Sequence, residues 1–365
     1  MKILQIINSL GTGGAEKLLL DTIPLYRQKG IEMDILLLWN NNHQFTQTLM
    51  DMNVCKVHIL SESQNVRDIY NPMHILKMRS VMKNYAVVHV HLFPAQYFTV
   101  IANRLNGRSS KLVFTEHNTS NNRISSRFLK IIDRLFYKDY SKLVCISEEI
   151  RQIYLDYLGS PEKLALIPNG IDVEKYNSAA AADRKKIHQD ISVGDKIIIQ
   201  VSAFRPQKDQ DTVIKSLTHL PEAFKLVLVG DGERKNLLVE LVEKLSLQHR
   251  VFFLGQRMDI PQLLKASDAV VLSSHYEGLS LASVEGMASG RPFVASDVPG
   301  LHDVVAGAGV LFPQGDSEQL AAILSRLITD REYAAEVSDK CYQRAREFGI
   351  EKLISRHIDL YNQLQ

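Results

Sequence analysis

The sequence contains little cysteine and no long apolar run. Its three cysteines (Cys55, Cys145 and Cys341) are far apart, lie in apolar surroundings and lack metal-ligand spacing. We therefore expect reduced thiols in the core of a cytosolic protein. A membrane-spanning helix needs about 18 or more consecutive apolar residues. No segment has such a run, so the sequence predicts no spanning helix.

The first residues lack the features of a secretion signal. Met1 to Gln5 lead directly into an apolar strand pattern, without a long apolar segment or a small-residue cleavage site. A secretion signal needs both features. We therefore expect a cytoplasmic protein.

The sequence also lacks a strong excess of either charge. The formal net charge is +2; residues 1–175 hold 21 basic and 16 acidic side chains, and the remaining residues hold 22 and 25. A basic first part and an acidic second part suggest different partners for the two parts. The excess is too small for a nucleic-acid-binding protein, and no basic stripe interleaved with aromatic residues accompanies it. We expect no nucleic-acid partner.

The chain length and the alternation of elements predict two α/β domains. A chain of 365 residues suggests two domains rather than one core. Short apolar strands alternate with helix-period segments from Lys2 to Ile167, and the alternation restarts at Lys196. This order indicates doubly wound parallel sheets, and the polar residues after Asp172 indicate a domain junction. The expected domains are residues 1–175 and 176–349, followed by a last helix at about 350–365.

The most informative stretch is residues 271–297. An apolar run, Ala269 to Leu272, predicts a buried strand that leads into a loop. Ser280 is a plausible N-cap for a helix over about 281–289. Gly290 fits the left-handed position after a helix end, and the proline two residues later prevents the helix from continuing.

Two glutamates flank the start of this helix. Glu277 lies in the loop before it, and Glu285 lies on it, eight positions later. Free N–H groups at residues 278–281 and the helix dipole would attract an anion, while the carboxylates would accept hydrogen bonds from hydroxyl groups. An anion flanked by hydroxyl groups describes a nucleotide sugar. A surface loop with solvated glutamates explains the same residues without a ligand.

Two loops of the first half are further candidates. Residues 11–14, Gly-Thr-Gly-Gly, follow the first strand and open a helix, so their backbone could hold a phosphate. They form neither a G-x-G-x-x-G pattern, because Glu16 stands where the third glycine belongs, nor a P-loop. A tight strand-to-helix turn is the alternative. His117 follows another strand, with a functional and a structural role equally open, whereas His89 and His91 on the adjacent predicted strand are more typical of structural histidines.

Two cations follow the first strand of the second half. Arg205 and Lys208 lie three positions apart near a helix start, where positive charge opposes the helix dipole. A diphosphate between them would explain both, because Arg can bind it through two hydrogen bonds and Lys can neutralise it as a point charge. The alternative is a solvated basic turn.

Two other patterns in the second half are weaker. Asp209-Gln210-Asp211 matches a metal-binding D-x-D pattern, but these carboxylates lie where helix N-cap residues are expected, and no other acidic or histidine cluster stands beside them. We therefore expect no metal site. Gly230, in Gly-Asp-Gly, would let a ligand approach the backbone closely. A plain turn explains this glycine equally well.

Together these loops resemble those of the retaining glycosyltransferases of family 4, which have the GT-B fold. The resemblance covers nearly the whole chain, and the order and spacing of the motifs agree. Its specific part is the Glu-x7-Glu segment with its flanks, since the glycine loops alone are not specific. The matching segments are Gly13-Gly14-Ala15-Glu16, residues 144–148, 167–172, 230–232 and 252–255, and Glu277-Gly278-Leu279-Ser280 with Glu285 and Gly290-Arg291-Pro292.

The resemblance implies an α/β GT-B architecture and a reaction. Two Rossmann-like, doubly wound domains would face each other across an interdomain cleft, and the last helix would cross back to the first domain. The protein would move a sugar from a nucleoside-diphosphate donor, of UDP or GDP type, to a glycan or lipid-linked acceptor hydroxyl. The anomeric configuration would be retained, and neither a metal nor another cofactor would be needed.

The resemblance also implies roles for the candidate residues. Lys208 would neutralise the leaving diphosphate, His117 would touch the donor sugar near the reacting carbon, and Glu277 would hold that sugar. Glu285 would bind the ribose hydroxyls. The full set of implied donor-binding residues is Gly13, Gly14, Arg205, Lys208, Gly230, Glu277, Gly278, Leu279, Ser280 and Glu285.

One position departs from the family pattern. Family members usually have an arginine five residues before the lysine that corresponds to Lys208, and this chain has Ala203 there. Arg205, two residues later, could supply the missing charge. The departure bears on donor affinity or rate and leaves the expected fold unchanged.

Residues 123–138 form a basic amphipathic segment. Such stripes usually face the core while their basic side chains extend to water. The alternative is peripheral contact with an anionic bilayer, which would suit a lipid-linked acceptor. The apolar residues at helical spacing are Phe128, Ile131, Ile132 and Leu135, among the cations Arg127, Lys130, Arg134 and Lys138.

Other functions fit parts of the pattern. A glycosidase would use the two glutamates as acid and nucleophile, although their placement beside an anion site suits donor binding better. A nucleotide-sugar epimerase of the same fold would convert the donor without an acceptor. A hinged solute-binding protein would also have two α/β domains, but it would need a secretion signal. A catalytically inactive, nucleotide-binding relative is suggested by Ala203.

Overall fold

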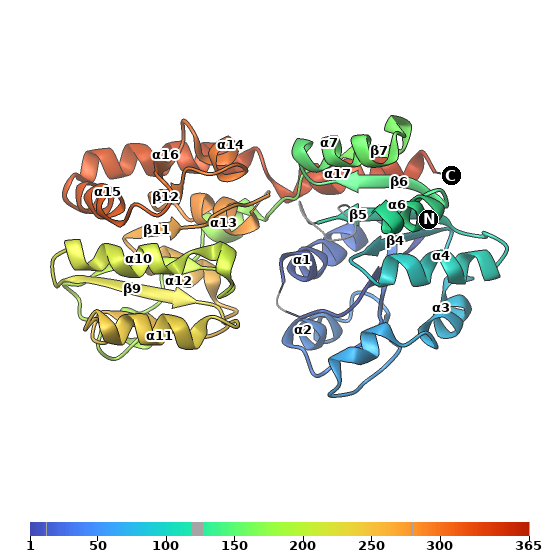
Figure 1. The fold of residues 1–365 in the computed structure, drawn as a ribbon, viewed down its shortest axis with the longest axis horizontal. Coiled ribbons are helices and arrows are strands. Elements are labelled where there is room, and N and C mark those ends of the chain that lie inside the picture. The colour runs from blue at the N-terminus through green and yellow to red at the C-terminus, as the bar shows by residue number, and fades with distance from the viewer. Residues whose placement is uncertain (12, 118–126, 279, 365) are drawn as a thin grey trace. The chain divides into compact units, whose positions relative to one another are not determined.

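The computed structural model describes residues 1–11, 13–117, 127–278 and 280–364. Leu279, one of the implied donor-site residues, lies outside the described residues. The chain folds into two compact units (Figure 1). Unit 1 comprises Met1–Gly170 and Ile350–Gln365, and unit 2 comprises Ile171–Gly349.

Unit 1 is built around a seven-stranded sheet in the order β3-β2-β1-β4-β5-β6-β7. All of its described pairings are parallel. Five of the six residues of β1 are buried, as expected for a strand whose two faces are both covered by helices. The strands are β1 (Lys2–Ile7), β2 (Glu32–Leu37), β3 (Val57–Ile59), β4 (Val87–His91), β5 (Lys111–Glu116), β6 (Tyr140–Cys145) and β7 (Leu164–Leu166).

The helices of unit 1 begin and end where local sequence signals allow. For example, the Ser147 hydroxyl accepts a hydrogen bond from the amide of Ile150 at the start of α7, and Gly159 adopts a left-handed conformation after its end. The helices are α1 (Gly14–Gln28), α2 (Gln44–Met52), α3 (His74–Met82), α4 (Ala95–Leu105), α6 (Arg127–Tyr137), α7 (Glu148–Leu158) and α17 (Ile350–Asn362), with 3₁₀ turns η1 (Val66–Tyr70) and η2 (Pro161–Lys163).

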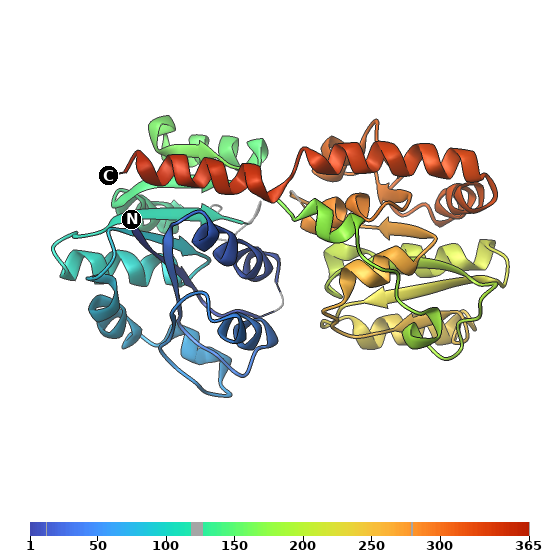
Figure 2. The same cartoon turned by 180° about the vertical axis from the view of Figure 1, so that it is seen from behind.

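The last helix, α17, belongs to unit 1 although it follows unit 2 in sequence. It lies beside α1 (Figure 2), where Lys29 and Glu351 form an ion pair of 2.8 Å. The Tyr26 hydroxyl on α1 lies 2.7 Å from Nδ1 of His357 on α17. These contacts tie the end of the chain to its beginning.

Unit 2 contains a six-stranded sheet in the order β10-β9-β8-β11-β12-β13. Its described pairings are all parallel as well. Two doubly wound parallel sheets confirm the α/β fold class predicted from the alternation of elements. The strands are β8 (Lys196–Val201), β9 (Phe224–Val229), β10 (Val251–Phe253), β11 (Ala269–Leu272), β12 (Phe293–Ser296) and β13 (Val310–Phe312).

The helices of unit 2 surround a separate apolar core that contains all six of its strands. They are α8 (Val173–Asn177), α9 (Arg184–Ile187), α10 (Gln210–Ser216), α11 (Lys235–Lys244), α12 (Ile260–Ala266), α13 (Leu281–Ala288), α14 (Leu301–Val305), α15 (Ser317–Thr329) and α16 (Arg331–Arg346), with 3₁₀ turns η3 (Pro206–Lys208) and η4 (Leu217–His219).

The polar segment after Asp172 is not a linker. Val173, Tyr176 and Ile187 are buried in the core of unit 2, and the amide of Ala182 donates to the carbonyl of Gln262 on α12. The polar composition of this segment obscured these three buried residues, because each is flanked by polar side chains in the sequence. The division between the units therefore lies at Gly170–Ile171, before this segment.

Helix α6 also differs from the core-facing interpretation. Ile131 and Leu135 are exposed, at 63% and 52%, whereas Asp133 and Tyr137 are buried. Asp133 can be buried in place of an apolar residue because the Tyr157 hydroxyl donates a hydrogen bond to its carboxylate at 2.9 Å. The side chains of Arg127 and Phe128 lie outside the described residues. No helix in the described part of the chain is both long and apolar enough to cross a membrane.

Candidate active site

In unit 2 the chain runs outward from β8 to β9 and β10 and then returns to β11 on the other side of β8. Open parallel sheets bind ligands outside the carboxyl ends of their strands at such a switch point. The loops that leave β8 and β11 carry Lys208 and Glu277. The sheet order therefore brings together two residues that are 69 positions apart in sequence.

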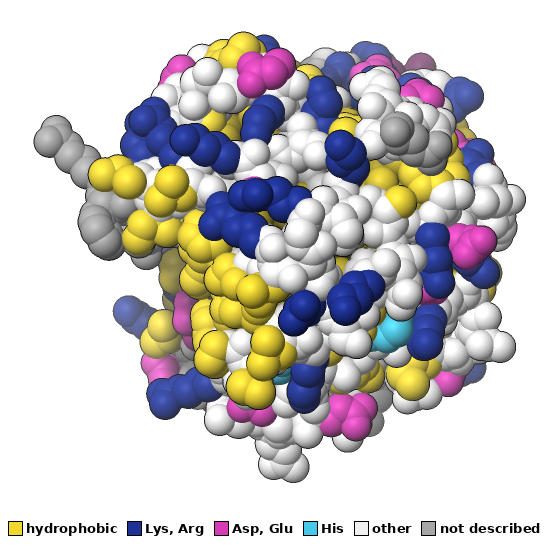
Figure 3. All heavy atoms as spheres, turned by 90° about the vertical axis from the view of Figure 1, so that its right-hand side faces the viewer, with side chains coloured by type: hydrophobic (Ala, Val, Ile, Leu, Met, Phe, Trp, Pro, Cys, Tyr) yellow, Lys and Arg dark blue, Asp and Glu magenta, His cyan; other side chains and the backbone are white. Residues whose placement is uncertain are grey.

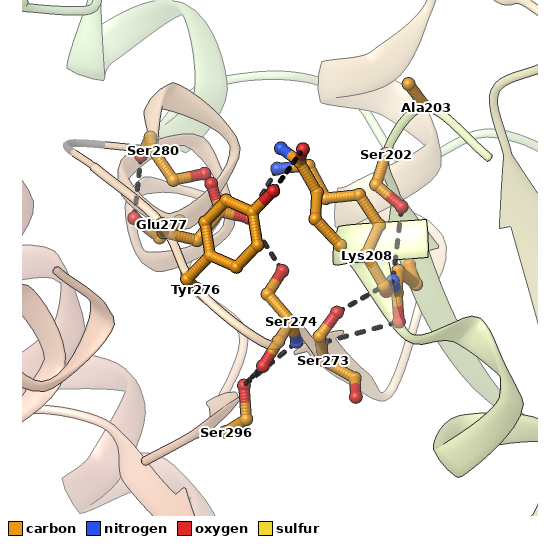
Figure 4. A network of polar contacts seen from close by, with 12 residues as sticks. Ser202, Ala203, Lys208, Ser273, Ser274, Tyr276, Glu277, Ser280 and Ser296 are labelled. Carbon is orange, nitrogen blue, oxygen red and sulfur yellow. Dashed lines mark hydrogen bonds and ion pairs between the residues drawn. The ribbon is translucent and has the colours of Figure 1, made fainter. Parts of the chain in front are cut away.

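Lys208 and Glu277 form an ion pair at this switch point (Figure 4). Nζ of Lys208 pairs with Oε1 of Glu277, and the hydroxyl of Ser274 donates to the same oxygen at 2.6 Å. Glu277 is 8% exposed, so its charge is held largely away from water. A buried carboxylate needs such partners, because burying an unpaired charge is costly. Within the described residues these bonds reach only Oε1, so Oε2 can accept a hydrogen bond from a hydroxyl group.

A network of amides and hydroxyls fixes the two loops beneath this pair. The side-chain amide of Gln200, at the end of β8, donates to the carbonyl of Lys208 at 3.0 Å and to the hydroxyl of Ser202 at 3.1 Å. The amide of Ser274 donates to the Ser296 hydroxyl at 2.9 Å, and that hydroxyl donates to the Ser274 carbonyl at 2.7 Å. The ion pair thus rests on loops held by buried polar contacts from β8 and β12.

The start of α13 follows Glu277 directly. Ser280 stands at the N-cap position, but within the described residues its hydroxyl accepts no hydrogen bond from the first-turn amides. Ser280 is nevertheless the N-cap residue of α13, as predicted, and its carbonyl accepts hydrogen bonds from the amide of Ser283 at 3.2 Å and from the hydroxyl of Ser283 at 2.7 Å. First-turn amides have no partner inside a helix, so this helix start is suited to an anion. Glu285 is half-buried on the same helix.

Gly278 lies between the ion pair and α13, and a second glycine shapes its backbone. Gly300 has φ = +81°, and a Cβ there would lie 2.2 Å from the carbonyl oxygen of Glu277 and 2.8 Å from that of Gly278. No side chain fits in that space. The loop after β12 therefore supports the backbone of the Glu277 loop from below.

Arg205 is not part of this network. Its side chain is exposed, and among the described residues the guanidinium makes no hydrogen bond or ion pair. Ala203 is also exposed, and it lies at the edge of the network beyond Ser202 (Figure 4). The structure thus brings Lys208 to Glu277 and leaves Arg205 in water.

The two carboxylates of the D-x-D pattern have separate partners. Asp209 accepts hydrogen bonds from the hydroxyls of Thr212 at 2.7 Å and Ser273 at 3.0 Å. Asp211 is bound by both terminal nitrogens of Arg234, at 2.7 and 3.0 Å. Asp209 stands at the start of α10 but does not cap it through its side chain. Its carboxylate joins the loop after β8 to the loop after β11 instead.

Gly230 is explained by the protein itself. It has φ = +139°, and a Cβ at this position would lie 2.0 Å from the carbonyl oxygen of Ser202. The loops after β8 and β9 thus approach each other too closely for any side chain. The close approach that the sequence suggested is between two backbone segments, so the glycine requires no ligand to explain it.

In unit 1 the corresponding switch point lies between β1 and β4. Asn8, just after β1, donates to the carbonyl of Phe93, just after β4, at 2.7 Å. Gly13 and Gly14 follow at the start of α1, where both are exposed and Gly13 provides no side-chain cap. A helix of 15 residues thus begins with two exposed glycines at the carboxyl edge of the sheet.

His117 leaves the same edge, directly after β5. Its Nε2 lies 3.0 Å from Nδ1 of His91, whose Nε2 lies 2.9 Å from Oε1 of Gln5. His89 is also buried, between the hydroxyls of Tyr361 at 2.6 Å and Thr115 at 2.7 Å. His89 and His91 are thus hydrogen-bonded core residues, as predicted, and His91 contacts the candidate site residue.

Burial lowers the pKa of these histidines. The pKa of His117 falls to about 4, and those of His89 and His91 fall well below the ordinary value, with neighbouring histidines adding to the effect. A charged imidazolium is disfavoured where water cannot solvate it. These rings are therefore neutral at neutral pH.

Metal ligands are not gathered in the described part of the chain. No group of three or more His, Cys, Asp or Glu residues is placed there to hold a metal ion. The positive charge near Glu277 comes from Lys208 and from the start of α13.

Comparison with known proteins finds a matching protein family for each of the two units. Residues 12–175 match the family "Glycosyltransferase Family 4", and residues 182–348 match "Glycosyl transferases group 1". The chain belongs to the family 4 glycosyltransferases. The GT-B fold and the glycosyltransferase function predicted from the sequence are therefore confirmed, and the epimerase alternative is not favoured.

Three relatives of this glycosyltransferase illustrate the range of the family. The UDP-Gal:alpha-D-GlcNAc-diphosphoundecaprenol alpha-1,3-galactosyltransferase of Escherichia coli is 27% identical over 90% of this chain and 89% of its own. The N-acetyl-alpha-D-glucosaminyl L-malate synthase of Bacillus anthracis is 27% identical over 76% and 75%. The crystal structure of Anabaena HepE in complex with UDP-glucose has a TM-score of 0.84, with 25% identity and coverage of 100% of both chains.

Two residues of the site were missed in the sequence. Ser274 lies two positions after the end of β11 and three positions before Glu277, and the rule that ligands meet loops after parallel strands could have drawn attention to it. Gly300 follows a proline after β12, and a Pro-Gly pair marks a turn. The sequence does not reveal which loop that turn supports, because the contact joins segments 23 residues apart.

Proposed function

We propose that this glycosyltransferase is a metal-independent, retaining hexosyltransferase that uses a UDP-sugar. The observation that carries the proposal is the arrangement of Lys208, Ser274 and Glu277 at the start of α13. It combines a cation, a helix start suited to an anion and a carboxylate acceptor within one loop region. The diphosphate and the hydroxyls of a nucleotide sugar need these three features together. UDP is favoured because the Escherichia coli and Anabaena relatives are named with UDP-sugars.

The donor residues have distinct proposed roles. Glu277 accepts hydrogen bonds from the sugar hydroxyls through Oε2, and Glu285 accepts from the ribose. The amide of Gly278 helps to hold the donor sugar, and the start of α13 faces the diphosphate. Lys208 moves from Glu277 towards the diphosphate when the donor binds, which leaves Ser274 to hold the carboxylate.

The remaining implied contacts complete the donor site. Arg205 is exposed and able to turn towards the diphosphate as a second cation. Gly13 and Gly14 contribute backbone amides at the start of α1, and Gly230 keeps the loop after β8 in place. His117 contacts the donor sugar.

The reaction requires two charges to be stabilised. The bond between the anomeric carbon and the phosphate oxygen breaks, and its electron pair goes to the diphosphate. The acceptor oxygen bonds to the same face of the carbon, and its proton passes to the departing phosphate oxygen. Lys208 and the helix amides stabilise the diphosphate charge in a preorganised way. They provide the positive charge that a metal ion supplies in other transferases.

Three variants test the site: Glu277→Ala, Glu285→Ala and Lys208→Ala. With UDP-glucose and UDP-galactose as probes, we expect UDP release to fall by about 100-fold or more for Lys208→Ala, as when an oxyanion-stabilising donor is removed. Val193→Ala, at an exposed position of unit 2, is the control. Unchanged turnover in all three variants would contradict the assignment. Activity retained in EDTA tests metal independence, and the anomeric configuration of the product, measured by NMR, tests retention.

We also propose a membrane-linked acceptor, on the basis of an apolar strip on unit 1. Ring contacts join Tyr70 to Phe93 at 6.2 Å, Phe93 to Tyr97 at 5.4 Å, and Tyr97 to Phe136 on α6 at 4.5 Å between centroids. Ile131 extends the strip along α6. Figure 3 shows hydrophobic side chains gathered on this face with Lys and Arg beside them. The strip comprises Tyr70, Phe93, Tyr97, Ile131, Leu135 and Phe136.

Cations border the strip on α4 and α6. Arg104 lies over the Phe136 ring at 5.4 Å and donates to the Leu135 carbonyl at 2.8 Å. Lys130 and Arg134 belong to α6 itself. Apolar side chains edged by basic ones are the pattern of peripheral binding to anionic bilayers. This chemistry favours an acceptor like the diphosphoundecaprenol-linked sugar in the name of the Escherichia coli relative over a water-soluble acceptor.

Vesicle flotation tests the membrane contact. The wild-type protein is expected to float with vesicles of phosphatidylcholine and phosphatidylglycerol and to remain unbound with phosphatidylcholine alone. Ile131→Glu/Leu135→Glu is expected to abolish flotation, because it places two charges in the strip. Val193→Glu is the matched control, since Val193 is 86% exposed and lies in unit 2. Equal flotation of all variants would remove the strip from the proposal.

A further inference from the structure

Gln5, His91 and His117 form a hydrogen-bonded row across three neighbouring strands or their ends. Gln5 lies on β1, His91 ends β4 and His117 follows β5. Gln5 and His91 are buried, and His117 is half-buried at the edge of the sheet. The row therefore begins in the interior at Gln5 and ends at the edge of the sheet with His117.

The orientation of Gln5 sets the start of the row. Its Nε2 lies 3.4 Å from the Sδ of Met33 and 3.4 Å from the Tyr361 hydroxyl, and its Oε1 faces His91. A thioether sulfur accepts hydrogen bonds but donates none. Reversing the amide would place oxygen against sulfur, acceptor against acceptor. The amide nitrogen therefore points to Met33 and the oxygen to His91.

The protons of the two rings follow from this orientation. Since Oε1 of Gln5 only accepts, Nε2 of His91 carries the hydrogen that lies between them. A neutral imidazole has one N–H, so Nδ1 of His91 is an acceptor. The partner at 3.0 Å, Nε2 of His117, must then donate. The hydrogen of His117 is committed to His91, and its Nδ1 carries the lone pair.

The ring of His91 is also held in orientation by stacking. It stacks on the ring of His89, with centroids 4.6 Å apart and an interplanar angle of 27°. His89 is itself fixed by hydrogen bonds to Tyr361 and Thr115. A flip of the His91 ring would break its bonds to Gln5 and His117 together. The row thus has one consistent arrangement of donors and acceptors.

We propose that Gln5 and His91 are positioning residues that hold His117 as its Nε2–H tautomer, so that Nδ1 accepts a hydrogen bond from a hydroxyl of the donor sugar. The role in turnover rests on the proposed function, since it assumes that His117 contacts the donor. An acceptor nitrogen suits a hydroxyl ligand. A neutral ring also avoids placing a positive charge near the anomeric carbon, where positive charge develops in the transition state.

The tautomer can be measured directly. In protein labelled with ¹⁵N-histidine, long-range ¹H–¹⁵N correlation spectra distinguish a protonated Nε2 from a protonated Nδ1. We expect the Nε2–H form for His117 in the wild type and in His91→Asn, because Oδ1 of asparagine stands where Nδ1 of histidine does and accepts the same bond. In His91→Leu the acceptor is lost, and we expect a mixture of tautomers.

Kinetics with UDP-glucose or UDP-galactose as the donor provide the second readout. We expect kcat to fall roughly tenfold in His91→Leu, the effect of losing about one hydrogen bond in the transition state, with little change in donor KM. His91→Asn should recover most of the loss. Gln5→Leu should behave like His91→Leu. His58→Leu, the same replacement at a half-buried histidine outside the row, should change neither readout.

The two possible failures can be told apart. A protonated Nδ1 of His117 in the wild type, or an unchanged tautomer and kcat in His91→Leu, would overturn the positioning role. If the wild type shows the Nε2–H form but releases no UDP from either donor, the proposed function fails instead. If His91→Leu loses its fold, as seen by circular dichroism, Gln5→Leu carries the same test.

Discussion

Lys208 and Glu277 are joined in an ion pair although they belong to loops after different strands. Their side chains are 15% and 6% exposed, so each charge relies on the other for stabilisation. Breaking a buried pair by removing one partner leaves an uncompensated charge, whereas removing both does not. The pair therefore couples the stability of unit 2 to the residues proposed to bind the donor.

A double-mutant cycle should reveal this coupling. Lys208→Met and Glu277→Gln are each expected to lower the melting temperature of the unliganded protein, and Lys208→Met/Glu277→Gln should lose less than their sum. Contacting charges typically show coupling of about 0.5–3 kcal/mol. Lys340→Met and Glu336→Gln, at an exposed ion pair on α16, provide the control cycle and should be close to additive. Additive losses at Lys208 and Glu277 would mean that the pair contributes no stability.

The glycines beneath the site give a second prediction. Gly230→Ala and Gly300→Ala place a methyl group 2.0 and 2.2 Å from the carbonyl oxygens of Ser202 and Glu277, in backbone conformations that favour glycine. We expect each variant to lower the free energy of unfolding by at least about 2 kcal/mol. Gly194→Ala, where nothing lies within 4 Å, should be nearly neutral. Thermal unfolding of the three variants is the measurement, and equal melting temperatures would exclude the close approaches.

The buried histidines of unit 1 predict an acid-sensitive stability. Burial lowers the pKa of His117 to about 4 and that of His357 to about 3, whereas unfolded histidine titrates near about 6.5. Between these values the unfolded state binds more protons than the folded state. The stabilisation is therefore fully present above about pH 6.5 and is lost as the pH falls towards about 4. Each unit of pKa difference is worth about 1.4 kcal/mol.

Melting temperatures measured between about pH 8 and about pH 4.5 test this expectation, because this range covers the pH interval in which the stabilisation is lost. His357→Asn keeps an acceptor for the Tyr26 hydroxyl but does not titrate, so its melting temperature should fall less steeply with acid. The exposed His219→Asn should retain the wild-type slope. The pKa of Asp133, raised to about 6 by burial, acts in the opposite direction and reduces the net slope. A melting temperature independent of pH would contradict the prediction.

The sequence predicted the strands well because buried parallel strands are continuous apolar runs. β11 has the predicted bounds, and β1 and β8 begin at the predicted residues, Lys2 and Lys196. The same apolar runs located the loops that carry Lys208 and Glu277. Polar contacts between distant loops were not predictable in this way. The carboxylate of Asp209, for example, accepts a hydrogen bond from Ser273 on the loop after β11, 64 positions later, and no spacing rule links these two residues.

The sequence could not predict which face of α6 is exposed, for another reason. Helical periodicity places Ile131 and Leu135 on one stripe but does not show whether that stripe meets the core. The core of unit 1 instead receives Tyr137 and the carboxylate of Asp133, which is acceptable there because the Tyr157 hydroxyl donates to it. A polar residue that finds a buried partner can reverse the direction predicted from hydrophobicity alone.

The departure at Ala203 gives the last prediction. If Arg205 supplies the charge that family members usually place at position 203, Arg205→Ala should raise the KM for a UDP-sugar by about tenfold, the value of one charge-assisted hydrogen bond. Ala203→Arg/Arg205→Ala should then recover donor binding. Ala203 is exposed and its carbonyl is already bound by Gln210, so a longer side chain displaces no core residue.

Arg205→Ala and Ala203→Arg/Arg205→Ala together show whether the position of the cation matters or only its charge. Recovery in the double variant would show that either residue can hold a cation at the diphosphate. A donor KM that is unchanged in Arg205→Ala but lowered in Ala203→Arg alone would instead mean that this chain works without the second cation and that Lys208 carries the charge by itself. Arg257→Ala, which removes an arginine paired with Asp259 elsewhere in unit 2, controls for the loss of a positive charge and should leave the KM unchanged.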